Sequence, residues 1–178
     1  MNANTKKIID YAILNRKAEK NATVFFGADY LSDIPICELA DTYLPDTLVY
    51  NRSLKGLDIN TAQEVLDSLV CSLQPDKVFV CLGENDVKKP DFELEIFAEK
   101  FEWLLYTLHA RCNCKIFILS VPDAACGQIN TVLQSISQKH GCVFIDTRDC
   151  RASFLQLFSK IRFFLRSHPI TFFEAMHG

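Results

Sequence analysis

Five short runs of β-branched and aromatic residues recur along the chain, separated by longer segments with a different spacing. The runs are Thr23–Phe26, Thr47–Tyr50, Lys77–Leu82, Lys115–Ser120 and Cys142–Asp146. Most of them are apolar throughout rather than alternating, which is typical of strands that are buried on both faces. The pattern therefore predicts five strands of a parallel sheet.

The segments between these runs repeat apolar residues every three or four positions, as amphipathic helices do. The predicted helices are Thr5–Ala18, Ile36–Tyr43, Asn60–Leu73, Asp91–Ala110, Ile129–His140 and Ser153–Ile161, with a short one after Pro169. Strands that alternate with helices imply right-handed crossovers with helices on both faces of the sheet. We predict an α/β fold, a three-layer αβα sandwich of the flavodoxin-like type, as a single domain over residues 1–178.

The net charge of −3 over 178 residues gives no electrostatic reason to bind nucleic acid or an anionic membrane. The N-terminus lacks the apolar core of a secretory signal, and no run is long enough for a membrane span. We expect a cytoplasmic protein without a membrane span and without a nucleic-acid partner.

Eight cysteines are spread over the chain, and none forms a Cys-x-x-Cys pair. We interpret them as buried free thiols of a reducing compartment rather than as disulfides or metal ligands. No Gly-x-Gly-x-x-Gly follows the first strand, and no phosphate-binding loop with Gly-Lys-Ser/Thr is present. We therefore expect no cofactor and no bound metal.

Four loops carry short motifs at the places where a parallel sheet binds ligands. They read VFFGADYLSD, VYNRSLKGLD, VFVCLGENDV and LRSHPITFF. In this order they resemble the Gly-Asp-Ser, Asn-Arg-Gly-x-x-Gly, Gly-x-Asn-Asp and Asp-x-x-His-Pro motifs of the SGNH (GDSL-type) ester hydrolases. The resemblance implies that family's fold, with the strand order 2-1-3-4-5.

The resemblance also assigns a role to each matching position. In this family a serine attacks an ester carbonyl, a histidine takes its proton, and an aspartate three residues earlier orients the histidine. The oxyanion donors correspond to Gly56 and Asn85, and the histidine to His168. Asp29 stands at the nucleophile position and Leu165 at the position of the orienting acid. The resemblance thus implies a retained oxyanion cradle without the serine nucleophile.

The carboxylate at position 29 changes what this cradle can do. At a helix N-terminus it would occupy the space meant for a substrate oxyanion. We predict that Asp29 forms an ion pair with His168, because their family counterparts touch. Ser32 lies a helical turn further on and is a poor substitute nucleophile, while Asp146 or Asp149 could replace the lost acid from another loop.

Three functions are compatible with this pattern, and the sequence leaves open whether the chain is an enzyme. The first is a non-catalytic SGNH-like protein that binds an acyl ester, an acetylated carbohydrate or a partner at the old active site. The second is an atypical esterase or acylhydrolase that uses Asp29 and His168. The third, ranked lowest, is a magnesium or calcium site formed by Asp29, Glu84, Asp86 and Asp123.

The C-terminal part of the chain is rich in phenylalanine. The residues are Phe154, Phe158, Phe163, Phe164, Phe172 and Phe173. We interpret them as core or as a partner surface. The short segment after Pro169 predicts a shorter final helix than the family has, which would leave apolar surface for a homodimer contact.

Overall fold

A single parallel sheet organises the computed structural model, which describes residues 3–166. Its strands are β1 (Thr23–Gly27), β2 (Val49–Asn51), β3 (Lys77–Cys81), β4 (Lys115–Leu119) and β5 (Val143–Ile145). They lie in the order β2-β1-β3-β4-β5, and every neighbouring pair is parallel. The predicted α/β class and strand order are confirmed.

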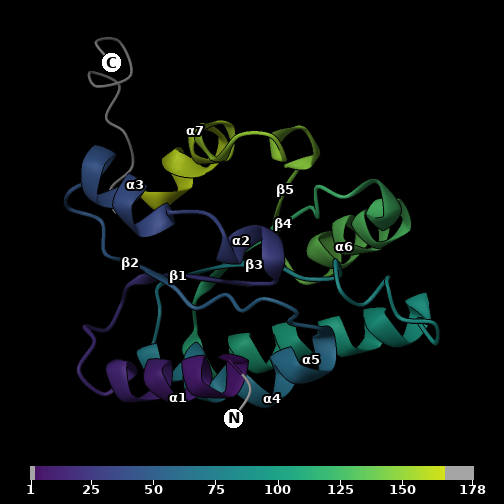
Figure 1. The fold of residues 1–178 in the computed structure, drawn as a ribbon, viewed down its shortest axis with the longest axis horizontal. Helices are drawn as coiled ribbons and strands as arrows, with labels where there is room; N and C mark the ends of the chain where they lie inside the picture. The colour runs from purple at the N-terminus through teal and green to yellow at the C-terminus, as the bar shows by residue number, and fades with distance from the viewer. Residues whose placement is uncertain (1–2, 167–178) are drawn as a thin grey trace.

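Helices cover both faces of this sheet (Figure 1). They are α1 (Ala3–Asn15), α2 (Asp29–Ser32), α3 (Ile36–Tyr43), α4 (Ile59–Leu69), α5 (Leu94–Cys112), α6 (Gly127–Lys139) and α7 (Phe154–Leu165), with single 3₁₀ turns at Cys71–Leu73, Ala124–Cys126 and Arg148–Cys150. Contacts run from α1 to α4, from α4 to α5 and from α5 to α6, so these four helices form one layer. On the other face α3 meets α7, where the rings of Tyr43 and Phe158 lie 5.5 Å apart.

Most helix boundaries differ from the prediction by a few residues, and one difference has a clear physical cause. The predicted helix Asn60–Leu73 ends early as α4, and the following 3₁₀ turn stops at Gln74, which is left-handed with φ 46°. The helix N-terminus expected at position 29 is the start of the single-turn helix α2, whose first residue is Asp29. The helix predicted after Pro169 lies outside the described residues.

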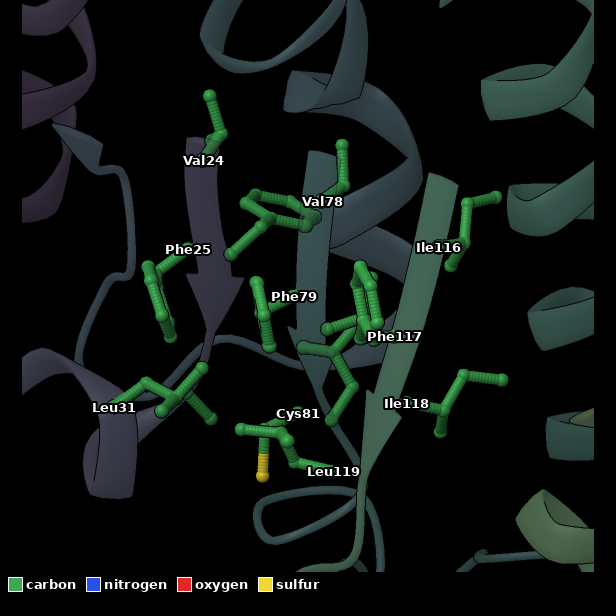
Figure 2. Close-up of a cluster of buried hydrophobic side chains, with 14 of the residues drawn as sticks. Val24, Phe25, Leu31, Val78, Phe79, Cys81, Ile116, Phe117, Ile118 and Leu119 are labelled. Atoms are coloured by element: carbon green, nitrogen blue, oxygen red, sulfur yellow. The ribbon is translucent and has the colours of Figure 1, made fainter. Parts of the chain in front are cut away.

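A ladder of phenylalanine rings crosses the centre of the sheet (Figure 2). Phe25, Phe79 and Phe117 are aligned on β1, β3 and β4. Their ring centroids lie 4.7 and 4.5 Å apart, with interplanar angles of 8° and 10°. Phe164 of α7 contacts Phe117 at 5.3 Å. Parallel strands in register place identical side chains on one face, so the sequence runs translate directly into this stacked core.

All eight cysteines are free thiols, as predicted. Five of them are buried, and the other three are partly buried. None of the helices within residues 3–166 is both long enough and apolar enough to cross a membrane.

Candidate active site

Three loops converge at the carboxyl ends of β1, β2 and β3. The chain leaves β1 and β3 in opposite directions along the sheet, so a crevice opens between the connections that follow them. Asp29 follows β1, Gly56 lies in the loop after β2, and Asn85 follows β3. All three are residues to which the sequence motifs assigned a role.

The tight end of β1 fixes the position of Asp29. A Cβ atom added to Gly27 would lie 2.4 Å from the carbonyl oxygen of Cys81, so the two strands approach too closely for any side chain there. The next residue, Ala28, donates its N–H to the same Cys81 oxygen at 3.1 Å. The chain then turns at once into α2, and Asp29 becomes its first residue.

The carboxylate of Asp29 occupies the cradle itself. Its Oδ1 accepts the Gly56 N–H at 3.0 Å, and its Oδ2 accepts the Asn85 side-chain amide at 2.6 Å. Gly56 has φ +69°, a left-handed conformation that aims its N–H at the carboxylate and that glycine adopts without strain. The same Asn85 nitrogen also donates to the Leu57 oxygen at 3.3 Å. Both donors that the resemblance assigned to a substrate oxyanion are therefore engaged by a side chain of the protein.

Polar side chains at the strand ends hold the second loop in place. Asn51 accepts the N–H of Ser53 at 3.0 Å and donates to the Leu31 oxygen at 2.9 Å. Asp86 Oδ1 accepts the N–H of Ile59, the first residue of α4, at 3.0 Å. The other oxygen of Asp86 is buried without a partner among the described residues, and burial raises the pKa of Asp86.

The N-terminal helix α1 braces the same loop, which the sequence analysis did not anticipate. Lys7 donates to the carbonyl oxygen of Ser53 at 3.2 Å. The guanidinium of Arg52 lies between the rings of Tyr11 and Tyr50, 4.6 and 4.9 Å from their centroids. Burial lowers the pKa of Arg52. An arginine directly after a buried strand was the available sequence signal, since such a residue needs partners inside the fold.

A pocket of about 320 Å³ opens beside the cradle. Its lining comes from the first loop and from the loops after β3, β4 and β5: Asp29, Tyr30, Asp33, Ile34, Glu84, Val121, Pro122, Asp123, Arg151, Ala152, Ser153 and Phe154. Glu84 accepts the N–H of Tyr30 at 3.1 Å, and Asp123 pairs with Arg151 at 3.2 Å. The sequence analysis missed the contribution of the segment 151–154.

Leu165 does not lie at the position of the orienting acid, so this part of the residue mapping is wrong. The Lys77 ammonium donates to the carbonyl oxygens of Leu165 and Arg166 at 3.1 and 2.7 Å. Lys77 is the first residue of β3, about 13 Å from the carboxyl end of that five-residue strand. Helix α7 thus carries Leu165 to the amino edge of the sheet, opposite Asp29. His168 lies outside the described residues, and its predicted ion pair with Asp29 stays a prediction.

The loop between β5 and α7 lines the pocket beside Asp29 instead. It contains no histidine. Asp149 and Ala152 stand three residues apart in it, and Ala152 lines the pocket together with Asp29. The residues that follow a parallel strand lie at the carboxyl edge of the sheet. Asp149, shortly after β5, was therefore the sequence signal that this loop lies near the site.

No histidine among residues 3–166 lies near the cradle. His109 is in the last turn of α5, and His140 is the C-cap of α6, each a few residues before the next strand begins. The hydroxyl of Ser32 donates to the backbone oxygen of Asp29 at 3.0 Å and is not part of the pocket lining. This part of the chain therefore places no imidazole base beside Asp29.

The lowest-ranked hypothesis, a magnesium or calcium site at Asp29, Glu84, Asp86 and Asp123, finds no support in the described residues. Among residues 3–166 no group of three or more His, Cys, Asp or Glu side chains is arranged to hold a metal ion. Asp29 is engaged by the cradle, Asp86 by the start of α4, and Asp123 by Arg151.

No protein-family model matches the chain, and no curated protein matches it. Solved structures do match. A platelet activating factor from Streptococcus pneumonia has a TM-score of 0.72 at 20% identity, covering 91% of this chain and 92% of its own. A GDSL-like lipase from Bacteroides thetaiotaomicron has a TM-score of 0.66 at 14% identity, covering 78% and 77%. An acetylxylan esterase from Geobacillus stearothermophilus has a TM-score of 0.60 at 14% identity, covering 78% and 81%.

These structures share the three-layer architecture with this chain over most of both lengths. The parallel sheet in the order 2-1-3-4-5 and the three converging loops agree with that similarity. The chain therefore has the fold of the SGNH, GDSL-type hydrolases.

Proposed function

We propose that this chain is a non-catalytic protein on the SGNH hydrolase fold, which binds its ligand in the pocket beside an oxyanion cradle filled by its own Asp29. The observation that carries the proposal is the pair of hydrogen bonds from Gly56 and Asn85 to the Asp29 carboxylate. Fold similarity alone does not decide activity, so the argument depends on this site.

Ester hydrolysis would require the Gly56 and Asn85 donors to bind the carbonyl oxygen that becomes negative in the transition state. Hydrogen bonds to a charged group contribute about 1.5–3 kcal/mol each, so displacing the Asp29 carboxylate from two of them is costly. A carboxylate that stays would repel the developing oxyanion. The same two contacts therefore remove both the binding site and the electrostatic stabilisation that an ester carbonyl needs.

The pocket lining favours a ligand rich in hydrogen-bond donors. Asp29, Glu84 and Asp123 present carboxylate oxygens, which only accept hydrogen bonds, while Tyr30 and Phe154 add aromatic surface. Sugar hydroxyls suit such acceptors better than an ester carbonyl does. Of the ligands that the sequence suggested, we therefore propose an acetylated carbohydrate over a simple acyl ester. A cytoplasmic location and a homodimer stay predictions.

The experiment compares hydrolysis and binding in one set of proteins. We expect wild type, Asp29→Asn and the control Asp91→Asn, an exposed aspartate of the third loop, to hydrolyse p-nitrophenyl acetate at the same background rate. None of the three should be labelled by a fluorophosphonate probe. Calorimetric titration with acetylated xylo-oligosaccharides should show binding to wild type and to Asp91→Asn that weakens in Glu84→Gln. Hydrolysis that is lost in Asp29→Asn, or stoichiometric labelling, would overturn the non-catalytic proposal.

A further inference from the structure

A hollow at the amino edge of the sheet lies apart from the pocket beside the cradle. Its volume is about 320 Å³, which is within the range of about 300–1,000 Å³ that is usual for small-molecule sites. The lining residues precede or begin the strands β1 to β4: Asn21, Thr23, Thr47, Leu48, Asp76, Lys77, Asn113 and Lys115. The proposed function does not use this hollow.

Three of the lining residues form one row across the sheet. Thr23, Lys77 and Lys115 are aligned on β1, β3 and β4. Each stands two residues before the ladder phenylalanine of its strand, and residues two apart on a strand point to the same face. Neighbouring strands lie about 4.8 Å apart, so the two lysines are side by side at the edge where the ladder ends.

The two ammonium groups of this row are not neutralised by the protein. Lys77 donates two hydrogen bonds to backbone oxygens at the end of α7, which leaves its third N–H for another acceptor. The ammonium of Lys115 has no hydrogen-bond or ion-pair partner among residues 3–166. Burial lowers the pKa of Lys77, and the charge of Lys115 lowers it further. Asp76 is the one carboxylate in the described lining, so a positive charge remains that favours an anion.

Hydroxyl groups without partners point to the same conclusion. Thr23 is 5% exposed and Thr47 is 9% exposed, and neither hydroxyl has a hydrogen-bond partner within residues 3–166. Buried polar groups are usually hydrogen-bonded, so these two are available to a molecule in the hollow that they line. Asn21 and Asn113, which are left-handed with φ 61° and 47°, place two side-chain amides beside them.

We propose that this hollow binds a small hydroxylated phosphomonoester, such as a sugar phosphate, with its phosphate group between the ammonium groups of Lys77 and Lys115. A phosphomonoester carries about −1.5 to −2 charges at pH 7 and three strong acceptor oxygens. Two lysines supply the matching charge, and the hydroxyls of Thr23 and Thr47 donate to the phosphate oxygens. The carboxylate of Asp76 accepts hydrogen bonds from hydroxyl groups on the rest of the ligand.

The lining also distinguishes this ligand from a nucleotide. Leu48 is the one apolar side chain among the described lining residues, and none of them is aromatic. A nucleobase is held mainly by stacking on aromatic rings and by apolar contacts, which this hollow lacks. A ligand whose surface is mostly hydroxyl and phosphate groups fits such a lining better.

This inference does not depend on the proposed function. The hollow lies at the amino edge, whereas the cradle lies beyond the carboxyl ends of β1 and β3. Glu84→Gln should leave binding at this hollow unchanged, and Lys115→Gln should leave the titration with acetylated xylo-oligosaccharides unchanged. Failure of either proposal therefore leaves the other standing.

Calorimetric titration of the full chain tests the ligand class. We expect glucose 6-phosphate and glycerol 3-phosphate to bind, inorganic phosphate to bind more weakly, and glucose to give no signal. Added sodium chloride should weaken binding, because Lys115 is exposed and its charge is screened by salt. Absence of binding by both esters, or tighter binding of adenosine monophosphate than of glucose 6-phosphate, would overturn the proposal.

Variants identify the residues, and Lys115 is the better choice because Lys77 also holds the end of α7. Lys115→Gln should weaken glucose 6-phosphate binding about tenfold, and Thr23→Val about threefold. The matched control Lys6→Gln removes the same charge from an exposed position near the start of α1 and should bind like wild type.

Equal weakening in Lys115→Gln and Lys6→Gln would overturn the proposal, because it would reflect only the net charge of the protein. Circular dichroism shows whether each variant is folded. If Thr23→Val fails to fold, the titrations of wild type and of Lys115→Gln still decide.

Discussion

The two edges of the sheet bear different kinds of polar groups. At the carboxyl edge, loop residues engage one another's side chains and backbone, as in the Asp29 contacts with Gly56 and Asn85. At the amino edge, Lys77 closes the end of α7 by donating to the carbonyl oxygens of Leu165 and Arg166. The first arrangement resembles a binding site whose centre is self-occupied, and the second is a helix cap.

Residues of a sequence motif can form a site only if the fold brings them to the same edge of the sheet. Gly56 and Asn85 follow strands, so they reach the carboxyl edge and meet Asp29. Leu165 follows a full helix and reaches the other edge, even though its spacing to His168 resembles the family motif.

The largest effect should come from the tight end of β1. In Gly27→Ala the added Cβ meets the Cys81 carbonyl oxygen at 2.4 Å and the Leu31 side chain at 2.9 Å, so the strands must shift. We expect a loss of about 3 kcal/mol in the free energy of unfolding, measured by urea denaturation. The control is Gly127→Ala at the start of α6, where a Cβ meets nothing within 4 Å. It should be neutral or stabilising by about 0.5–1 kcal/mol. Equal losses in both variants would contradict the close approach of β1 and β3.

The second test introduces a serine nucleophile and a histidine base at the carboxyl edge. Asp29→Ser frees Gly56 and Asn85, and Ala152→His places an imidazole in the pocket, three residues after Asp149. We expect the double variant to hydrolyse p-nitrophenyl acetate about a hundredfold faster than wild type, because a positioned base contributes at least that factor.

A matched variant tests whether the position of the introduced histidine matters. Asp29→Ser combined with Gln156→His, which places the histidine in the first turn of α7, should stay near the wild-type rate. A double variant with Ala152→His that remains at background while folded would show that the β5–α7 loop does not replace the Leu165 and His168 positions.

The third test concerns the amino edge. Lys77→Met removes two hydrogen bonds to the last carbonyl groups of α7, where a cation is also favoured by the helix dipole. We expect a loss of about 1.5 kcal/mol in the free energy of unfolding. Lys115 is the residue aligned with Lys77 on β4 and is exposed, so Lys115→Met is the matched control and should change stability little. Similar values for the two variants would argue against the cap.

The smallest effect should be a pH dependence that arises from Asp86. Burial raises its pKa in the folded protein, so the folded state binds this proton more tightly than the unfolded chain does. The contribution of Asp86 to stability therefore becomes more favourable as the pH falls through the folded pKa, and it is complete below the unfolded pKa.

Asp86→Asn removes the buried charge and retains an oxygen that can accept the Ile59 N–H. We expect this variant to be more stable than wild type by about 1 kcal/mol near neutral pH, and to match it below about pH 4. Thermal melts across this range measure the difference, with Asp91→Asn as the exposed control. A difference that does not change with pH would contradict the raised pKa.

Much of the architecture could be predicted from local patterns. The runs around Phe25, Phe79 and Phe117 are apolar on both faces, which leaves few alternatives to a covered parallel sheet. The helix Ile36–Tyr43 was predicted with its observed bounds. Gly56, Asn85 and Asp29 could be placed in one site because each lies within a few residues of a strand end, where the direction of the chain is already fixed.

The remaining parts of the site depended on the length and direction of whole elements. Helix α7 has 12 residues and is about 18 Å long, enough to carry Leu165 from the carboxyl edge to the amino edge. The predicted helix ends at Ile161, four residues before the observed end of α7, so the prediction does not carry the chain as far as the amino edge. Ala152 carries no chemical signal of its own, and only its position across the pocket from Asp29 gives it significance.

The fold class, the strand order implied by the loop motifs and the presence of Asp29 where the family has a serine could all be predicted from the chain alone, because these features depend on local composition and on short loops. The packing of the whole chain was needed to learn that the Asp29 carboxylate accepts hydrogen bonds from Gly56 and Asn85 and that Leu165 lies at the opposite edge. Hydrogen bonds act over a few ångströms, and here they join residues that are far apart in the chain. Their existence depends on how complete helices and strands pack, and no short motif contains that information.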